Sequence, residues 1–315
     1  MAPVLRSEDP EPELPAGASE GARADGGPDA EMLRSPKRRP TRPSVLVSTY
    51  RQPRELDLVL AALARQSRAP YEVLVCDDGS GERTRSVIDH WRERGDHPIE
   101  HVWQVDNGFR KARIMNEAVR RAKGDHLVFI DGDSFPHRNW VEDHVASADG
   151  RTVLCGRRVK LGPRLSPSVT RDDIEAGRFD TVFTPTLLKS GLEGDTKRLP
   201  LGLRLPRPVA RILHPRPRKL MGVNFSMPRD AFVHVNGYDE AWEFHGGEDR
   251  DLELRLIRAG IPLMPVLNRA IVFHLHHEER PDPERARELL DYVERSDHVR
   301  CTVGYAQYER FDPAT

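Results

Sequence analysis

The sequence has few cysteines, no long hydrophobic run and almost no net charge. Its three cysteines, Cys76, Cys155 and Cys301, are far apart and form no Cys-x-x-Cys pair, which fits a reducing cytoplasm. No stretch approaches the roughly 20 apolar residues of a membrane-spanning helix, and the N-terminus lacks the apolar core of a secretion signal. Lys+Arg (49) and Asp+Glu (50) nearly cancel, so the net charge predicts no binding to nucleic acid. We therefore expect a cytoplasmic protein whose membrane contact, if any, is peripheral and at the inner face.

Short apolar runs alternate with helical spacing over most of the chain, beginning at Ser44. Residues 1–43 are rich in Pro, Gly, Ala and Glu and lack apolar periodicity, so we predict that this tail is disordered. Strands alternating with helices imply an α/β domain with a mostly parallel, Rossmann-like sheet flanked by helices. We place one domain at 44–280 and a C-terminal helix with a tail at 281–315.

Two aspartates one residue apart, Asp131 and Asp133, directly follow the apolar run Leu127–Ile130. Such a short run predicts a buried parallel strand, and open α/β sheets bind ligands at the C-terminal ends of their strands. A carboxylate pair there can hold a divalent cation, Mn²⁺ or Mg²⁺, against a phosphorylated substrate. The alternative is an ordinary acidic turn.

Two other polar runs, Ser48-Thr49-Tyr50-Arg51 and Asp77-Asp78-Gly79-Ser80, also follow predicted strands. Since carboxyl ends of parallel strands line one crevice, we expect these runs to lie beside the aspartate pair. There the carboxylates of the second run can accept hydrogen bonds from a nucleotide, although the same residues form good turns. Lys111, which opens a predicted helix, is placed to meet a phosphate or to lie on a solvated basic face.

The aspartate pair alone leaves a cation under-coordinated, so a further ligand is expected. His274 directly follows the apolar run Ala270–Phe273, as a residue at a strand end would. His276 shares its face at strand spacing and is the fallback, whereas His277 is expected to point the other way. A surface without metal is the alternative. The hypothesis requires Asp133 and His274 to meet in one cleft.

Glu248 and Asp249 stand before an apolar periodic helix, which places both carboxylates in its first turn. That is a common helix start. The preceding Gly246-Gly247, however, allows the backbone to approach a bound group closely. The functional interpretation is a general base, with Asp249 the first choice.

The segment 157–220 is rich in proline and arginine and interrupts the alternating pattern. Residues 197–219 carry eight basic residues and no acidic residue, interleaved with leucine, valine and isoleucine. Such a segment can lie on an anionic membrane or grip a lipid diphosphate, or it is a solvated, mobile surface loop.

The motifs resemble family-two glycosyltransferases of the GT-A fold over about 44–279. Val45–Tyr50, Val75–Ser80 and Phe129–Asp133 are similar to the nucleotide half of that family, and the aspartate pair to its Asp-x-Asp motif. The second half, 221–280, resembles β-1,4-galactosyltransferases and bacterial polysaccharide synthases through three runs: Gly222–Ser226, Val235–Asp239 and Gly246–Asp251. The resemblance implies a GT-A domain with a nucleotide-binding half at 44–150, the basic insertion at 157–220 and an acceptor-binding half.

The resemblance also implies a role for each matching position. The residues implied to bind a UDP-sugar donor are Thr49, Tyr50, Arg51, Asp77, Asp78, Lys111, Asp131 and Gly132. The implied metal ligands are Asp133, His274 and Asp131, and the implied catalytic base is Asp249, assisted by Glu248. Contact with the acceptor, a glycan, lipid-linked or small molecule, is implied for Glu248, Trp242 and Asn224.

Two departures from the family pattern bear on specificity and stereochemistry. Phe244-His245-Gly246-Gly247 stands where galactosyltransferases carry a Trp-Gly-Trp-Gly-Gly type of sequence, which points to a different acceptor subsite. Related retaining enzymes tend to carry Gly-Glu-Asn where this chain has Gly247-Glu248-Asp249, which favours inversion. The predicted reaction is transfer of a galactose- or N-acetylhexosamine-type sugar.

Two other functions remain open at this point. Val128–Asp133 also resembles the nucleophile strand of haloacid-dehalogenase-type phosphatases, in which Asp131 would be a covalent nucleophile. Phe135 stands where that family usually has Thr or Val. The other alternative is a protein that binds a nucleotide sugar but does not catalyse sugar transfer.

Overall fold

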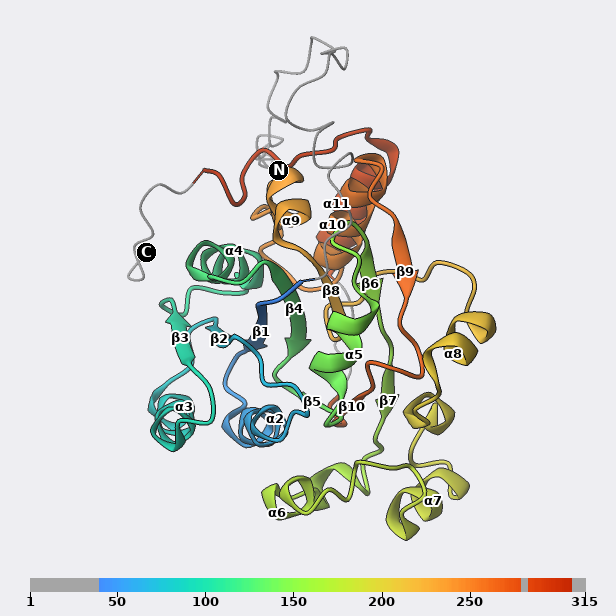
Figure 1. Ribbon diagram of the computed structural model, residues 1–315. Coiled ribbons are helices and arrows are strands. Elements are labelled where there is room, and N and C mark those ends of the chain that lie inside the picture. Colours follow the sequence, from blue (N-terminus) through green and yellow to red (C-terminus); the bar gives the residue numbers. More distant parts are fainter. Residues whose placement is uncertain (1–39, 279–282, 308–315) are drawn as a thin grey trace, which may run out of the picture.

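The computed structural model describes residues 40–278 and 283–307 (Figure 1). The predicted disordered tail therefore lies almost entirely outside the described residues. The strands are β1 (Pro43–Thr49), β2 (Glu72–Asp77), β3 (Ile99–Trp103), β4 (His126–Asp131), β5 (Ser134–Pro136), β6 (Val153–Cys155), β7 (Arg158–Lys160), β8 (Phe225–Pro228), β9 (Leu263–Pro265) and β10 (Val272–His274). The α-helices are α2 (Pro53–Ala64), α3 (Glu82–Arg94), α4 (Lys111–Arg121), α5 (Trp140–Ser147), α6 (Arg171–Glu175), α7 (Pro185–Leu192), α8 (Arg207–Leu213), α9 (Arg229–His234), α10 (Glu248–Arg258) and α11 (Glu284–Arg295), with 3₁₀ turns η1 (Ser166–Ser168) and η2 (Leu199–Gly202).

A seven-stranded sheet in the order β3-β2-β1-β4-β8-β6-β9 forms the centre of the molecule. β1 to β4 pair in parallel, β8 pairs antiparallel with β4 and β6, and β9 pairs in parallel with β6. The direction of the chain therefore reverses between β4 and β8. The prediction of a mostly parallel α/β sheet flanked by helices is confirmed.

The inner parallel strands β1, β2 and β4 are buried on both faces, which explains their largely apolar sequences, whereas the edge strand β3 is only partly buried. Val45 and Val47 face one core with side chains of α2, α3 and α5, while Leu46 faces a second core with side chains of α4, α9 and α10. Figure 1 shows these two groups of helices on opposite sides of the sheet. The two layers hold the carboxyl ends of β1, β2 and β4 at one rim.

A second, three-stranded sheet in the order β5-β10-β7 lies next to that rim. β10 pairs antiparallel with β5, so that His274 is opposite Ser134. This pairing brings His274, from late in the chain, next to Ser134, which directly follows Asp133.

The basic segment 157–220 contains several short helices. It includes α6, α7 and α8, and Lys160 of β7 forms an isolated bridge with Lys197. Residues 197–219 are partly helical through η2 and α8, and the alternative of a mobile surface loop for them stays a prediction. None of the helices in the described part of the chain has the length and apolar character needed to cross a bilayer.

Candidate active site

A carboxylate and two imidazoles meet just beyond the end of β4. Asp133 Oδ1 lies 3.1 Å from His274 Nδ1, and Asp133 Oδ2 lies 3.4 Å from His277 Nε2. The three candidate ligand atoms all lie within 4.8 Å of one another. Burial acts to raise the pKa of Asp133, but hydrogen bonds from His274 and Ser134 and the proximity of His277 outweigh it and lower that pKa. One carboxylate with two imidazoles is a mixed donor set that can hold a divalent transition-metal ion.

Three expectations about the ligands differ from this arrangement. His277 was expected to point away, but β10 ends at His274, so strand alternation no longer applies beyond that residue. His276, the fallback, is exposed, and only its backbone N–H is engaged, with the Ser166 hydroxyl. Asp131 is not part of the cluster, because its carboxylate accepts a hydrogen bond from Ser48 and pairs with a lysine instead.

That lysine, Lys111, stands at the start of α4 among carboxylates from two other elements. Its Nζ lies 3.2 Å from Asp131 Oδ1 and 3.5 Å from Glu248 Oε1. Burial would lower the pKa of Lys111, but Asp131, Asp249 and Glu248 raise it well above its usual range. The ammonium is therefore held charged between the end of β4 and the start of α10.

Asp249 is held in place by two hydrogen bonds from outside its own helix. Gly222 N–H donates to its Oδ2 at 2.7 Å, and the Tyr238 hydroxyl donates to its Oδ1 at 3.2 Å. Desolvation raises the pKa of Asp249 to about 6; Lys111 opposes the rise, and Glu248 and Asp131 add to it. A carboxylate of this kind is ionised at neutral pH and still basic enough to take a proton.

Glu248 is fixed by the glycine pair that precedes it. Its Oε2 accepts from the backbone N–H groups of Gly246 and Gly247, both at 3.2 Å. Gly247 has φ 146°, and a Cβ there would lie 2.3 Å from ring atoms of Trp242. Only glycine fits at this position, so the glycine pair serves close packing and the orientation of Glu248.

The predicted nucleotide residues line the neighbouring strand ends. Asp77 lies 2.9 Å from His101 Nε2 and accepts from the Ser80 N–H at 2.8 Å. Asp78 accepts from Gln104 and from the backbone N–H of Arg110, and burial raises its pKa. These bonds tie the end of β2 to the start of α4.

The end of β1 contributes the remaining donor-side positions. The Thr49 hydroxyl is buried without a hydrogen-bond partner, and Gly132 packs against it so closely that a Cβ would lie 3.1 Å from that oxygen. Tyr50 and Arg51 are exposed and both bind Asp106, at 3.1 and 2.6 Å. Asp106, like His101 and Tyr238, was not predicted from the sequence; only Tyr238 stood within a recognised motif.

Trp242 and Asn224, two of the residues predicted to contact the acceptor, are both buried. Trp242 is 1% exposed and packs in a small core with side chains of α11. Asn224 is fully buried; its Oδ1 accepts from Trp140 Nε1 at 2.9 Å, and its Nδ2 donates to two backbone carbonyls. Packing encloses Trp242 and internal hydrogen bonds engage Asn224, so both side chains support the fold, and their contact with the acceptor stays a prediction.

Asn224 also ends a buried polar chain behind the sheet. Asn224 Oδ1 lies 3.1 Å from His144 Nε2, His144 Nδ1 lies 2.8 Å from Ser226 Oγ, and Ser226 Oγ lies 3.0 Å from His126 Nε2. Desolvation lowers the pKa of His126 to about 4 and that of His144 to about 3. Both imidazoles are therefore neutral in the folded protein near pH 7.

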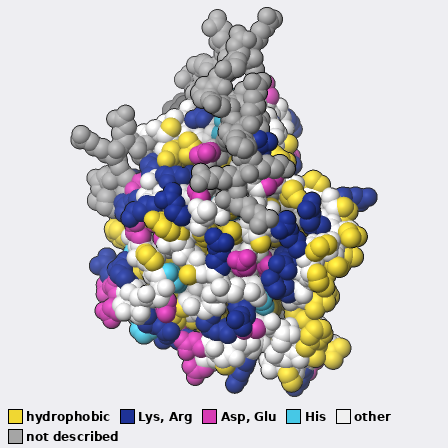
Figure 2. All heavy atoms as spheres, in the orientation of Figure 1, with side chains coloured by type: hydrophobic (Ala, Val, Ile, Leu, Met, Phe, Trp, Pro, Cys, Tyr) yellow, Lys and Arg dark blue, Asp and Glu magenta, His cyan; other side chains and the backbone are white. Residues whose placement is uncertain are grey.

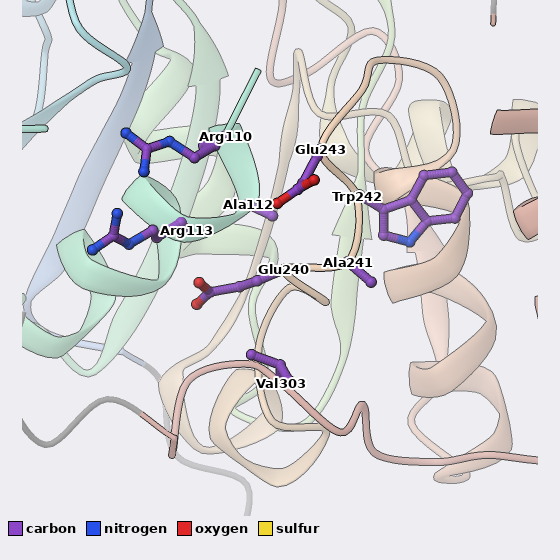
Figure 3. Close-up of a pocket in the computed structure, with 8 residues that line it drawn as sticks. All are labelled: Arg110, Ala112, Arg113, Glu240, Ala241, Trp242, Glu243 and Val303. Carbon is purple, nitrogen blue, oxygen red and sulfur yellow. The ribbon is translucent and has the colours of Figure 1, made fainter. Parts of the chain in front are cut away.

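A pocket of about 460 Å³ lies beside α4. Figure 3 shows it between the start of α4 and the loop 240–243, with the indole of Trp242 turned away from the arginines. The lining residues are Arg110, Ala112, Arg113, Glu240, Ala241, Trp242, Glu243 and Val303. Cationic side chains of α4 and its N-terminal neighbour Arg110 thus face acidic side chains of the loop 240–243 across this space.

Two family models match the chain on either side of the basic segment. Residues 44–189 match the model of glycosyl transferase family 2, and residues 213–278 match the model named N-terminal domain of galactosyltransferase. The first of these models shows the likeness of the chain to glycosyl transferase family 2. The resemblance predicted from the motifs is confirmed, and the phosphatase alternative is set aside.

Several relatives of this chain are longer proteins. It is 31% identical over 227 residues to a validoxylamine A glucosyltransferase of Streptomyces hygroscopicus subsp. limoneus, a match that covers 70% of this chain and 49% of that protein. It is 28% identical over 257 residues to the chondroitin synthase of Pasteurella multocida, covering 76% of this chain and 25% of that protein. The chain thus spans half or less of the length of these relatives.

The fold also matches a solved structure. A crystal structure of Staphylococcus aureus TarS in complex with UDP-GlcNAc superposes with a TM-score of 0.54 at 16% identity. The match covers 84% of this chain and 69% of that chain. At this identity the likeness supports the GT-A fold alone.

Proposed function

We propose that the protein is a metal-dependent, inverting hexosyltransferase that moves a sugar from a UDP-sugar to an acceptor hydroxyl. The observation that carries the proposal is the approach of α10 to the end of β4, where Lys111 links Asp131 with Glu248. Asp131 and Asp133 are two residues apart and so at most about 7 Å from each other along the chain. The candidate base and the candidate metal ligands therefore belong to one site.

A uridine diphosphate sugar is the donor class that the comparisons favour. TarS is described in complexes with UDP-GlcNAc and with UDP, the latter at a TM-score of 0.50. In this chain the buried Thr49 hydroxyl and the carboxylates of Asp77 and Asp78 offer hydrogen bonds to a base and a ribose. The type of sugar, galactose or N-acetylhexosamine, stays a prediction from the C-terminal motifs.

The donor set beyond β4 fits a divalent cation. Asp133, His274 and His277 would hold it, and their nitrogen-rich set suits Mn²⁺ better than Mg²⁺, which prefers oxygen ligands in near-octahedral geometry. When bound there, such an ion neutralises charge on a diphosphate leaving group. Asp131, which pairs with Lys111, is not proposed as a direct ligand of the metal.

Asp249 is the proposed base in this reaction. Its carboxylate takes the proton from the acceptor hydroxyl while that oxygen bonds to the anomeric carbon and the bond from this carbon to the diphosphate oxygen breaks. Its pKa of about 6 keeps it ionised above neutral pH. Glu248, bound to Lys111 and to two backbone N–H groups, orients this turn of α10.

The pocket beside α4 is the proposed space for the acceptor. Its mixed arginine and glutamate lining suits a polar saccharide or cyclitol more than an apolar ring system. The name of one relative, validoxylamine A glucosyltransferase, is consistent with a small polyhydroxylated acceptor. A glycan or lipid-linked acceptor and a cytoplasmic location stay predictions.

A donor panel tests the proposal directly. Nucleotide sugars are added with and without Mn²⁺, and thermal shift and transfer to offered saccharides are measured. We expect one UDP-sugar to stabilise the protein only with Mn²⁺, and Asp249→Asn to keep this stabilisation but lose transfer by about 10³-fold or more. Asp230→Asn, an exposed carboxylate on α9, is the matched control. Near wild-type transfer by Asp249→Asn would refute the assignment of the base, and donor binding without transfer by the wild type would support a non-catalytic protein.

A further inference from the structure

Helix α8 presents an exposed apolar face to solvent. Val209, Ile212 and Leu213 are 42, 77 and 58% exposed. Isolated exposed apolar residues are common, but three on one short helix form a patch that requires an explanation. We call this set of three side chains the α8 face.

The opposite side of α8 is anchored to the domain. Ala210 is 5% exposed, and Arg207 donates to the carbonyl oxygen of Ala146 at 2.6 Å. At its end, His214 Nε2 lies 2.8 Å from Oδ1 of Asn268, and Asn268 Nδ2 donates to the carbonyl oxygens of Pro200 and Leu203. These contacts hold α8 in a fixed orientation, so the α8 face is a stable outward surface.

The surroundings of the α8 face are cationic. Arg211, Arg216, Arg218 and Lys219 are exposed, and residues 197–219 contain no aspartate or glutamate. Arg204, in contrast, binds the buried carboxylate of Asp143 at 2.8 Å. Arg204 therefore belongs to an inward part of the basic segment, which anchors it to the domain. The exposed basic residues form an outward part, and the segment itself has no acidic residue to balance their charge.

Hydrophobic side chains continue from α8 toward α7 on the same side of the molecule. Figure 2 shows them over both helices, with Lys and Arg side chains next to those of α8. On and before α7, Leu192 is 90% exposed and Phe183 is 63% exposed. The apolar surface thus extends beyond one helix.

We propose that this surface docks on the anionic surface of a lipid bilayer, with the apolar side chains of α8 inserted between head groups. Apolar residues flanked by Lys and Arg are the combination that interfacial helices use, and each basic residue near an anionic surface strengthens binding by roughly fivefold. A second copy of the chain fits worse, since a two-fold contact through the α8 face would bring together two copies of the segment 197–219, which carries eight basic residues and no acidic one. The proposal narrows the membrane prediction for 197–219 to its outward part and does not depend on the proposed reaction.

Vesicle co-sedimentation of the full chain tests the proposal. We expect binding to vesicles of phosphatidylglycerol and phosphatidylcholine, little binding to phosphatidylcholine alone, and weaker binding as salt is raised. The double variant Ile212→Glu with Leu213→Glu is expected to lower the partition ratio at least about tenfold, or 1.4 kcal/mol. Ile257→Glu, at a residue 50% exposed on α10, is the matched control and is expected to bind like the wild type. Thermal unfolding of each variant shows whether it is folded.

Each contrary outcome overturns the proposal. Absence of wild-type binding to anionic vesicles excludes the bilayer as the partner. An equal loss of vesicle binding with Ile257→Glu, or no loss of binding with the double variant, excludes the α8 face as the membrane-binding surface. Equal binding to neutral vesicles excludes the role of Arg211 and its neighbours. A lipid-independent dimer in the wild type, lost in the double variant, would assign the face to a second copy of the chain.

Discussion

Replacing Asp249 by asparagine is expected to stabilise the folded protein at alkaline pH even though it removes the proposed base. The fold raises the pKa of this carboxylate from 3.8 to about 6, so ionised Asp249 is unfavourable in the native state. Each pKa unit corresponds to about 1.4 kcal/mol, which makes the cost of ionisation about 3 kcal/mol. Asparagine keeps the shape: its Oδ1 can accept from the Gly222 N–H and its Nδ2 can donate to the Tyr238 oxygen.

The sign of the pH dependence follows from the raised pKa. The native state binds more protons than the unfolded state between pH 4 and 6, so Asp249 lowers stability as pH rises through this window. The gain in the free energy of unfolding of Asp249→Asn is therefore complete at pH 8 and about half as large at pH 5. Because Lys111 loses one of its carboxylate neighbours, we expect a net gain of about 1–3 kcal/mol at pH 8.

Urea unfolding at pH 8 and pH 5 measures both quantities. Asp230→Asn, on the exposed side of α9, is expected to show no pH-dependent gain. A loss of stability in Asp249→Asn at pH 8 would contradict the argument. So would a gain of equal size at both pH values, because ionisation would then not be its origin.

Three other predictions concern the metal ligands, the buried histidines and the glycine pair. His277→Ala is expected to weaken Mn²⁺ binding, read as a thermal shift, by roughly tenfold or more, whereas His276→Ala leaves it unchanged; equal effects would exclude His277 as a ligand. The lowered pKa values of His126 and His144 predict that unfolding free energy falls below pH 6.5, by up to about 2 kcal/mol per histidine at pH 5; an unchanged slope in His144→Gln would contradict this. Gly247→Ala is expected to cost about 2–4 kcal/mol in urea unfolding, and wild-type stability would show that the loop relaxes freely.

Local sequence patterns predicted the parts of the site that directly follow strands. The apolar run before Asp131 and Asp133 and the run before His274 each end at a sheet rim, and the structure brings Asp133 and His274 to 3.1 Å. His277 escaped prediction because strand spacing was continued past the end of β10. Where periodicity stops, the direction of a side chain depends on the path of the loop, which the sequence does not reveal.

The burial of a side chain also depends on elements that are far away in the sequence. Trp242 and Asn224 stand in motifs that the family resemblance connects with the acceptor, yet each is enclosed by segments far away in sequence. Likewise, the basic segment showed no clear helical period, since α7 and α8 are short and α8 is held by contacts through Asn268. Short elements of this kind owe their stability to tertiary contacts more than to their own propensity.

The insertion of β8 beside β4 makes the two halves of the chain inseparable. Phe225 to Pro228 pair with His126 to Phe129, and Phe225 stacks on Phe129 with ring centroids 4.2 Å apart. A chain shortened before β8 would leave β4 as an unprotected, strongly apolar edge strand, which invites aggregation. Grafting the second half of one relative onto the first half of another would succeed only where this ladder and its aromatic stack are transferred intact.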